Sequence, residues 1–300
     1  MGRIFKRILI GSGVVIAALV VLLAGSIAVD GALGGGRVDA VANVRIPNAD
    51  GPEVRAYVAK PATPGPHPAV IMIHEVLGLT PNIAGRADLL AEAGYVVIAP
   101  DVFRGSSTEW IPRAIYQAVS TPPEQINGDL EAVFTWLASQ PDVQADRIAI
   151  MGFCFGGGTS LRYSLTNNQL AATVLFYGPP INDVERLKSL PGPVLGIFGG
   201  ADPSISAADV QAFESALTEA GVQNQISIYD GQPHAFITGA EGIRTSEVQG
   251  RAWNELLTFL NENLQGDATS RRDVAPTRGG NALAWGYLLR LALAHVGHTH

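Results

Sequence analysis

Residues 147–159 read RIAIMGFCFGGGT, and this stretch decides the fold. The apolar run at its start is typical of a strand that is buried on both faces of a parallel sheet. The segment Gly152-Phe153-Cys154-Phe155-Gly156 then matches the nucleophile-elbow pattern G-x-S-x-G, with cysteine in place of serine. That motif strains the backbone at its central residue, so its neighbours two positions away must lack side-chain bulk. The stretch therefore predicts a strand, a sharp turn at Cys154 and a helix after it.

Two other interpretations of these glycines compete with the elbow. A phosphate-binding loop would read G-x-x-x-x-G-K-[ST], but Gly158 stands where the lysine belongs, which leaves nothing to reach a phosphate. A merely structural turn around a buried Cys154 is the stronger alternative, because a lone cysteine usually behaves as a small apolar residue. The residues downstream of the turn distinguish the two.

An acid and a histidine occur downstream in the order that follows a nucleophile elbow. Asp202 comes after the apolar run Val194–Phe198, and His234 comes after the run Gln225–Tyr229. Taken alone, each would be an ordinary turn or capping residue. Because both stand at the end of an expected parallel strand, we expect them to meet Cys154 at one edge of the sheet. The sequence thus predicts a Cys-His-Asp arrangement for nucleophilic catalysis.

Short apolar runs alternate with amphipathic segments along the chain. The runs predict strands at Val54–Ala59, Ala69–His74, Tyr95–Pro100, Arg147–Gly152, Ala172–Tyr177, Val194–Phe198 and Gln225–Tyr229. Apolar residues spaced by three and four predict helices over 126–137, 210–217 and 253–264, the second after a capping box at Ser206 and Asp209. This alternation predicts an α/β fold with a mostly parallel central sheet flanked by helices.

The loop after the strand Ala69–His74 begins Glu75-Val76-Leu77. In a fold with a nucleophile elbow this loop donates one N–H to the oxyanion, and the residue after the nucleophile donates the other. We therefore expect the backbone N–H groups of Val76 and Phe155 to form the oxyanion hole. Glu75 is then expected near the thiol, although an acid here also fits a plain surface charge.

The N-terminal segment is apolar and uncharged from Ile8 to Val29. At about 1.5 Å per residue, a helix of this length spans a hydrocarbon core of about 30 Å. Basic residues precede it and Asp30 follows it, which orients the rest of the chain outside the cytoplasm. Its length favours a retained transmembrane helix in the cell membrane, whereas Ser26 and Ala28 fit a cleaved signal peptide. The main domain is expected on the periplasmic or extracellular side in the first case, and secreted in the second.

The 300 residues suffice for one sizeable domain with extensions. We expect a membrane anchor or signal segment over 1–30, a flexible glycine-rich linker over 31–40, a catalytic domain over 41–265 and a tail over 266–300, with an apolar segment over 282–296. The net charge of −7 excludes nucleic-acid binding, and the single cysteine excludes an internal disulfide and a cysteine-based metal site. The tail histidines fit a solvated chain end better than a metal site. No pattern indicates an oligomeric state.

Six motifs together resemble the dienelactone hydrolase family of α/β-hydrolases, over about residues 52–264. They are His74-Glu75-Val76-Leu77-Gly78-Leu79, Ala99-Pro100-Asp101-Val102-Phe103, Gly152-Phe153-Cys154-Phe155-Gly156-Gly157, Phe176-Tyr177-Gly178, Gly199-Gly200-Ala201-Asp202 and Pro233-His234-Ala235-Phe236. The resemblance implies an α/β-hydrolase fold and an enzyme that cleaves carboxylic ester or lactone bonds of small molecules through a thioester intermediate. It also implies that no metal or organic cofactor is used.

The resemblance assigns roles to the site residues: Cys154 is the nucleophile, His234 the base and Asp202 the residue that orients it. Glu75 is expected to interact with the resting thiol and to help activate it when substrate binds. One departure concerns specificity, because the family's type enzyme carries a carboxylate-binding arginine four residues after the histidine, where this chain has Thr238.

Arg104 is the candidate to replace the other arginine of the family, with an offset of one residue, and Tyr177 is a second candidate for substrate contact. The hydrolase chemistry is thus expected to carry over better than the specificity for dienelactones. Three other functions remain open: acyl transfer to another nucleophile by the same residues, a non-catalytic envelope binding module on the same fold, and a redox-sensing thiol at Cys154.

Overall fold

The structure, a computed structural model, describes residues 2–265 together with residues 286 and 290. Apart from these two positions, the tail over 266–300 and the apolar segment predicted within it lie outside the described residues.

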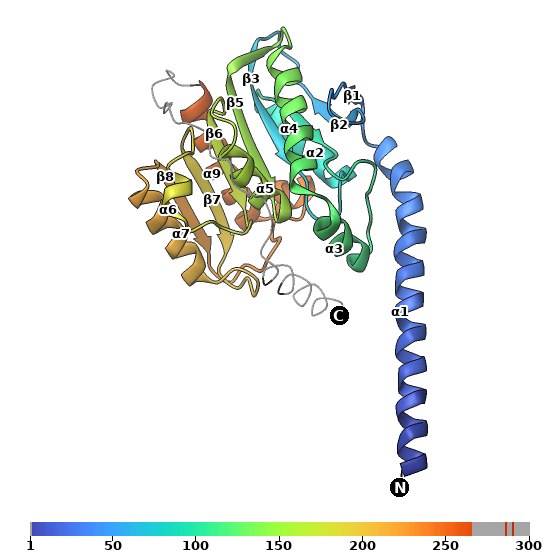
Figure 1. The fold of residues 1–300 in the computed structure, drawn as a ribbon. Coiled ribbons are helices and arrows are strands. Elements are labelled where there is room, and N and C mark those ends of the chain that lie inside the picture. The colour runs from blue at the N-terminus through green and yellow to red at the C-terminus, as the bar shows by residue number, and fades with distance from the viewer. Residues whose placement is uncertain (1, 266–285, 287–289, 291–300) are drawn as a thin grey trace.

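A single eight-stranded sheet forms the centre of the described chain (Figure 1). Its strands are β1 (Val44–Ile46), β2 (Val54–Ala59), β3 (His67–Ile73), β4 (Val96–Pro100), β5 (Val143–Phe153), β6 (Ala172–Phe176), β7 (Val194–Gly199) and β8 (Asn224–Tyr229). In space they follow the order β1-β2-β4-β3-β5-β6-β7-β8. β2 is antiparallel to β1 and β4, and every other neighbouring pair is parallel. The predicted mostly parallel sheet is therefore confirmed.

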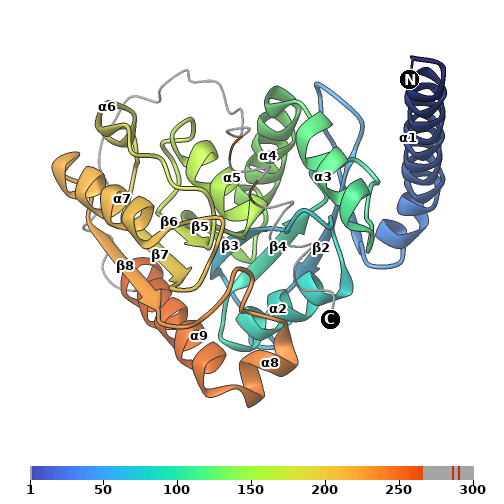
Figure 2. The same ribbon diagram turned by 90° about the horizontal axis from the view of Figure 1, so that it is seen from below.

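The central strands are apolar along their length because helices cover both faces of the sheet. Every residue of β4, β6 and β7 is buried, as expected for parallel strands enclosed on two sides. Figure 2 shows one layer of helices on each face. One layer holds α2 (Pro81–Glu92), α8 (Ala240–Thr245) and α9 (Glu247–Leu260), and the other holds α3 (Ile111–Ser120), α4 (Pro123–Ala138), α5 (Phe155–Ser164), α6 (Val184–Leu187) and α7 (Ala207–Glu219).

The capping box predicted for α7 is present. Ser206 Oγ accepts a hydrogen bond from the N–H of Asp209 at 3.1 Å, and Asp209 Oδ2 accepts one from the N–H of Ser206 at 3.1 Å. The third predicted helix ends earlier than its apolar stripe suggests, because α9 stops at Leu260 and a π-helical turn, Asn261–Gln265, follows. Leu264 in that turn is still buried, so the stripe correctly identified the side that faces the core.

Helix α1 (Gly2–Asp39) continues through the glycines for which the sequence predicts a flexible linker, so that prediction is wrong. The cause is tertiary contact. A Cβ atom on Gly34 would lie 3.0 Å from the backbone N of Ser107, and one on Gly31 would lie 2.9 Å from Cζ of Arg113. Glycine therefore allows the helix backbone to approach the domain closely, and this packing offsets a helix-propensity cost of about 1 kcal/mol per glycine.

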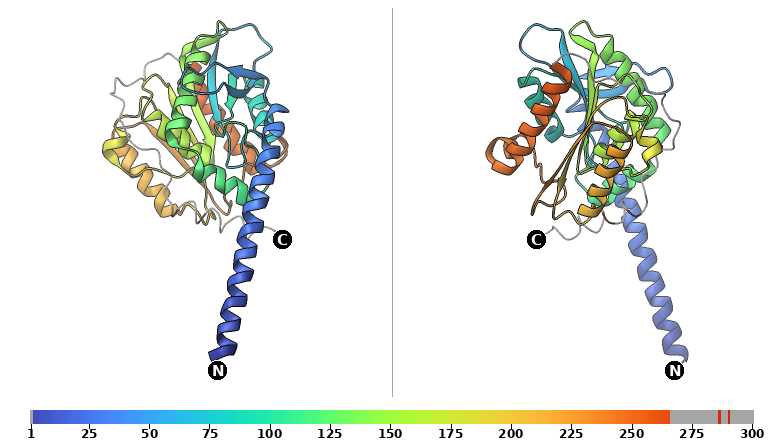
Figure 3. Two further views of the ribbon diagram at one scale, coloured as in Figure 1. Left: turned by 45° about the vertical axis from the view of Figure 1, so that its right-hand side comes forward. Right: turned by 90° about the vertical axis from the view of Figure 1, so that its left-hand side faces the viewer.

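The N-terminal part of α1 projects away from the domain (Figure 3). From Ala17 to Asp39 the helix is long and apolar enough to cross a membrane, and side chains such as Leu22 are 69% exposed. The last turns belong to the domain instead, since Val38 is fully buried and Arg37 donates a hydrogen bond to the Ser107 carbonyl at 2.9 Å. The part of the helix that is free of the domain therefore precedes residue 30.

Candidate active site

Cys154 occupies the turn between β5 and α5, at the carboxyl edge of the parallel strands. Its backbone has φ 54° and ψ −117°, a conformation that costs a non-glycine residue of the order of 1–3 kcal/mol. A Cβ atom on Gly152 would overlap the backbone of Gly156, and one on Gly156 would overlap the carbonyl of Ile73. The two glycines of the motif are therefore a steric requirement of the turn.

The strained turn holds Cys154 in one place. Its N–H donates to the carbonyl of Phe176 at 2.9 Å, which ties the turn to the end of β6, and the residue is 2% exposed. Phe155 is the first residue of α5, so the positive end of that helix lies at the cysteine. Negative charge that develops at this position during a reaction is stabilised by that helix end.

Asp202 and His234 lie together at the same edge, one after β7 and the other after β8. Asp202 Oδ2 and His234 Nδ1 are 2.6 Å apart, and both side chains are almost completely buried. The other carboxylate oxygen, Asp202 Oδ1, accepts from the N–H and the hydroxyl of Ser204 at 2.7 and 2.6 Å. Ser204 was not predicted, and it fixes the carboxylate so that one oxygen faces the imidazole.

The charges around His234 favour its protonated form. Burial alone would lower the pKa of the imidazole, but the Cys154 sulfur and the Asp202 carboxylate outweigh that effect and raise the pKa of His234 to about 10. Burial would conversely raise the pKa of Asp202, yet hydrogen bonds from His234 and Ser204 hold it below its usual range. The side chains of Cys154 and His234 also interact through a hydrogen bond. The arrangement thus favours an imidazolium at His234, held by the Asp202 carboxylate.

The Val76 N–H belongs to a peptide group that is held from its opposite side. The carbonyl of Glu75 accepts hydrogen bonds from His74 Nδ1 at 2.7 Å and from the N–H of Gly78 at 3.1 Å. In a trans peptide the carbonyl and the following N–H point in opposite directions, so these bonds fix the direction of the Val76 N–H. His74 Nε2 accepts from the N–H of Val102 at 3.3 Å, which defines the neutral tautomer.

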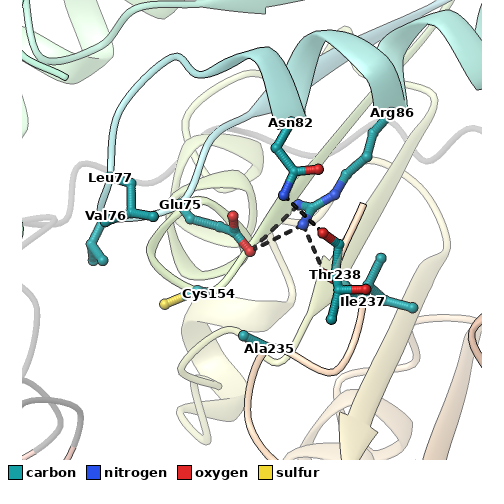
Figure 4. A pocket seen from close by; sticks show the side chains of 9 residues that line it. All are labelled: Glu75, Val76, Leu77, Asn82, Arg86, Cys154, Ala235, Ile237 and Thr238. Carbon is teal, nitrogen blue, oxygen red and sulfur yellow. Dashed lines mark hydrogen bonds and ion pairs between the residues drawn. The ribbon is translucent and has the colours of Figure 1, made fainter. Parts of the chain in front are cut away.

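A cavity of about 240 Å³ opens beside the cysteine (Figure 4). It is lined by Glu75, Val76, Leu77, Asn82, Arg86, Cys154, Ala235, Ile237 and Thr238. The Glu75 carboxylate turns towards Arg86 and away from the sulfur, with Glu75 Oε1 at 3.4 Å from Arg86 Nη1. Glu75 thus shares the cavity with Cys154, as predicted, while its ionic partner is Arg86.

Arg86 is a charged residue of the cavity that the sequence analysis missed. Its side chain is 1% exposed, its Nη2 donates to the Ile237 carbonyl at 2.8 Å, and its guanidinium lies 4.2 Å from the ring centre of Phe153. The arginine comes from α2, seven residues after the motif that ends at Leu79, and Ile237 is 151 residues away. Only the fold brings this cation to the wall that also carries Thr238.

The two predicted substrate-contact residues are not among the residues that line this cavity. Arg104 donates to both carboxylate oxygens of Asp129, at 3.0 and 2.8 Å, which commits its guanidinium to α4. Tyr177 is fully buried and packs edge-on against His234, with the two ring centres 5.2 Å apart. Burial, and then the charges of Glu75 and the Cys154 sulfur, raise the pKa of Tyr177 far above its usual range.

The part of the chain that the structure describes contains no group of three or more His, Cys, Asp or Glu residues placed to hold a metal ion. The groups gathered at the edge are the Cys154 thiol, the His234 imidazole with its Asp202 partner, and a fixed backbone N–H. This set is suited to attack on a carbonyl carbon and to stabilisation of the oxyanion that results.

The strand order, the strained turn at Cys154 and the Asp202–His234 pair at the same edge are those of an α/β-hydrolase. The sequence profile of the dienelactone hydrolase family matches residues 54–264. The chain is a hydrolase that belongs to the dienelactone hydrolase family.

Two of the similar proteins are matched over almost their full length. A candidate carboxymethylenebutenolidase of Synechocystis is 30% identical over 243 residues, which cover 74% of this chain and 96% of that protein. The crystal structure of a candidate dienelactone hydrolase from Klebsiella pneumoniae is 30% identical in sequence and has a TM-score of 0.66. The match covers 73% of this chain and 97% of that protein. A dienelactone hydrolase-like promiscuous phosphotriesterase, P91, from metagenomic libraries is 23% identical with a TM-score of 0.64, a likeness of fold.

Proposed function

We propose that this protein hydrolyses carboxylic ester or lactone bonds of small molecules with the thiol of Cys154 as nucleophile. The observation that carries the proposal is the pairing of a buried Asp202–His234 couple with a cysteine held in a strained turn at the same sheet edge. The curated relatives are candidate carboxymethylenebutenolidases, which supports a lactone or ester as substrate.

In the proposed mechanism the Cys154 thiolate attacks the carbonyl carbon and forms a tetrahedral intermediate. The N–H groups of Val76 and Phe155 bind its oxyanion, and the loss of one such donor typically costs about 2.7–4 kcal/mol. His234 gives its proton to the leaving alkoxide, which leaves a thioester on Cys154. His234 then takes a proton from water, the hydroxide attacks the thioester, and the acid product leaves as the thiolate re-forms. Asp202 keeps the imidazole in the required orientation throughout.

We assign the modulation of the thiol to the Glu75–Arg86 pair instead of to Glu75 alone. A lone carboxylate in this cavity would oppose a thiolate at Cys154 by like-charge repulsion. Arg86 neutralises that carboxylate and sits on the wall where Thr238 replaces an arginine of the family. Arg86 therefore supplies the positive charge of the cavity from a different element of the fold.

The test of the nucleophile compares the full chain with its Cys154→Ala variant on p-nitrophenyl acetate and on a dienelactone. We expect both activities to disappear in the variant while the fold, followed by circular dichroism, stays intact. Their ratio in the unaltered protein measures how far the change at Thr238 alters specificity. Equal hydrolysis by the two proteins would refute the thiol mechanism, and an absence of hydrolysis in either would favour the binding module.

We further propose that α1 is a retained membrane anchor. Its exposed apolar surface, preceded by Arg3, Lys6 and Arg7, supports insertion with the N-terminus in the cytoplasm and the catalytic domain outside it. The protein should then remain in the membrane pellet after an alkaline carbonate wash, with the mass of the full chain. Recovery of a soluble form that lacks the first 25–30 residues would show that the segment is a cleaved signal peptide.

A further inference from the structure

The contacts of α1 show on which side of the domain the candidate membrane span leaves. Asp39 bonds to Arg55 Nε at 2.8 Å, and the Arg55 carbonyl accepts from the N–H of Asp101, directly after β4 ends. Five residues earlier in α1, Gly34 lies against Ser107, which is farther along the same loop. These two contacts place the end of α1 beside the carboxyl edge of the sheet.

The next contact continues in the same direction. Gly31 lies against the guanidinium of Arg113 in α3, the helix that follows this loop, and the side chain of Val29 is 65% exposed. Figure 1 and Figure 3 show the remainder of α1 extending past α3 and clear of the domain. The free part of the helix therefore points away from the carboxyl edge, on the side where Cys154 and His234 lie.

This direction fixes where a bilayer must lie. The uncharged segment Ile8–Val29 corresponds to a helix of about 33 Å, the thickness of a hydrocarbon core. Asp30 then marks the end of the hydrocarbon core on the side of the domain, and the next residue, Gly31, contacts Arg113. A membrane that holds this segment reaches up to α3 and lies across the carboxyl edge of the sheet, where the loops after β3 and β8 line the cavity.

The surface of α3 has the composition of a membrane-contacting helix. Ile111 and Ile115, four residues apart, and the neighbouring Trp110 are only partly buried, and Tyr116 is 50% exposed. Among the described residues outside α1, Tyr116 is the one large apolar side chain that is exposed to solvent. Arg113 lies 5.3 Å from its ring centre. Tryptophan, tyrosine and a basic side chain are the groups that concentrate at the boundary between lipid and water.

We propose that α3 rests on the bilayer that holds α1, so that the catalytic cavity faces the lipid surface and takes amphiphilic esters or lactones dissolved in the membrane. The occupant of the α3 surface is thus lipid. The substrate assignment rests on the hydrolase activity proposed above and narrows it to acyl esters that partition into a bilayer. An ester that is dissolved in water has to reach the cavity through the space between domain and membrane.

Trp110 provides a direct test of the membrane contact. The full chain and its Trp110→Phe variant are reconstituted in phosphatidylcholine vesicles that contain lipids brominated near the headgroup, and the difference between their emissions isolates Trp110. We expect brominated lipid to quench this component, and aqueous iodide to quench it less in vesicles than in detergent. Quenching of Trp110 by iodide alone would overturn the proposal.

A pair of glycine variants tests the orientation. Leucine at Gly34 has to displace the backbone of Ser107, whereas a Cβ at Gly36 has no atom within 4 Å. In vesicles we compare the hydrolysis of a long-chain acyl ester with that of p-nitrophenyl acetate. We expect Gly34→Leu to lower the ratio of the two rates by about fivefold or more, and Gly36→Leu to leave it unchanged. Equal ratios in the two variants would contradict a fixed orientation.

The two experiments separate this inference from the hydrolase assignment. If no ester of either kind is hydrolysed but brominated lipid quenches Trp110, the hydrolase function is wrong and the membrane contact stands. If the acetate is hydrolysed and Trp110 is not quenched by lipid, the hydrolase function stands and the membrane-facing orientation is wrong.

Discussion

At the scale of single residues, two histidines near the carboxyl edge of the sheet favour opposite protonation states: His234 the charged form and His74 the neutral form. The surrounding charges raise the pKa of His234, and complete burial lowers the pKa of His74 to about 4. His234 is stabilised as an imidazolium beside Asp202, whereas His74 is stabilised as a neutral ring that bridges two backbone groups. The two side chains therefore influence stability at opposite ends of the pH range.

His234 should stabilise the fold in acid and neutral solution and lose that effect in alkali. Because its pKa is raised from 6.5 to about 10, its stabilisation is complete below pH 6.5 and disappears as the pH rises towards 10. We expect His234→Gln to remove this alkaline decline in the free energy of unfolding, measured by urea denaturation between pH 6.5 and 10, and to lower kcat by about 10³-fold or more. An unchanged alkaline decline would contradict the imidazolium assignment.

His74 should have the reverse effect. Its pKa is lowered from 6.5 to about 4, so the unfolded chain takes up a proton first and the fold loses stability as the pH falls between these values. In His74→Gln the acid decline over this interval should weaken. The variant should also lower kcat more than it changes KM, because the peptide that carries the Val76 N–H loses one of its two supports. A fall confined to KM would place the effect of His74 on substrate binding.

The residues that were predicted from the sequence are those that occur in fixed order along the chain. Cys154, Asp202 and His234 each follow a strand, and the strand pattern alone predicts that they meet at one edge of the sheet. Arg86 and Ser204 carry no such pattern, since an arginine within an amphipathic helix and a serine in a turn are ordinary residues. Their importance arises from contacts between distant segments, which a single sequence does not record.

At the scale of secondary structure, the strands with continuous apolar runs were the easiest to predict. The sequence does not predict β1, because this strand is three residues long and only Ile46 in it is buried. Both α2 and α3 start with proline at their first turn, after Thr80 and Trp110, and neither has a side-chain cap that would have indicated a helix start. The linker was predicted wrongly because glycine composition indicates flexibility only where no packing opposes it.

The turn between β5 and α5 provides a test of packing with a matched control. In Gly156→Ala the new methyl group overlaps the backbone of Ile73 and His74, so we expect loss of several kcal/mol of stability and of activity. In Gly128→Ala, within α4, the Cβ has no atom within 4 Å, and stability should rise by about 0.5–1 kcal/mol with activity unchanged. Urea unfolding and initial rates measure both. Similar losses in the two variants would show that the cost is not local to the turn.

At the scale of the whole molecule, the catalytic domain begins earlier than the predicted residue 41. Val38 is completely buried, and Asp39 bonds to Arg45 and Arg55 at 3.0 and 2.8 Å. The end of α1 is thus part of the domain as well as a continuation of the candidate anchor. From Ala17 to Val29 the described side chains of the helix are mostly exposed and apolar.

Truncation tests this boundary. A chain that begins at Arg37 retains the buried Val38 and the two ion pairs of Asp39, whereas a chain that begins at Val41 loses them. Burial of one valine stabilises a fold by about 1.5–3 kcal/mol, so the shorter chain should have a lower Tm by several degrees in scanning calorimetry. Identical Tm values would show that the domain proper starts after the helix.

The single cysteine described at the strained turn has a practical consequence. Since the 300 residues contain no other sulfhydryl, a thiol-directed electrophile can mark each molecule at one position. The amount of label bound per chain, measured after the chain has been isolated, then gives the fraction of molecules in which this one thiol is accessible. An initial rate divided by the concentration of labelled protein is then a rate per accessible thiol, whatever the total amount of protein in the preparation.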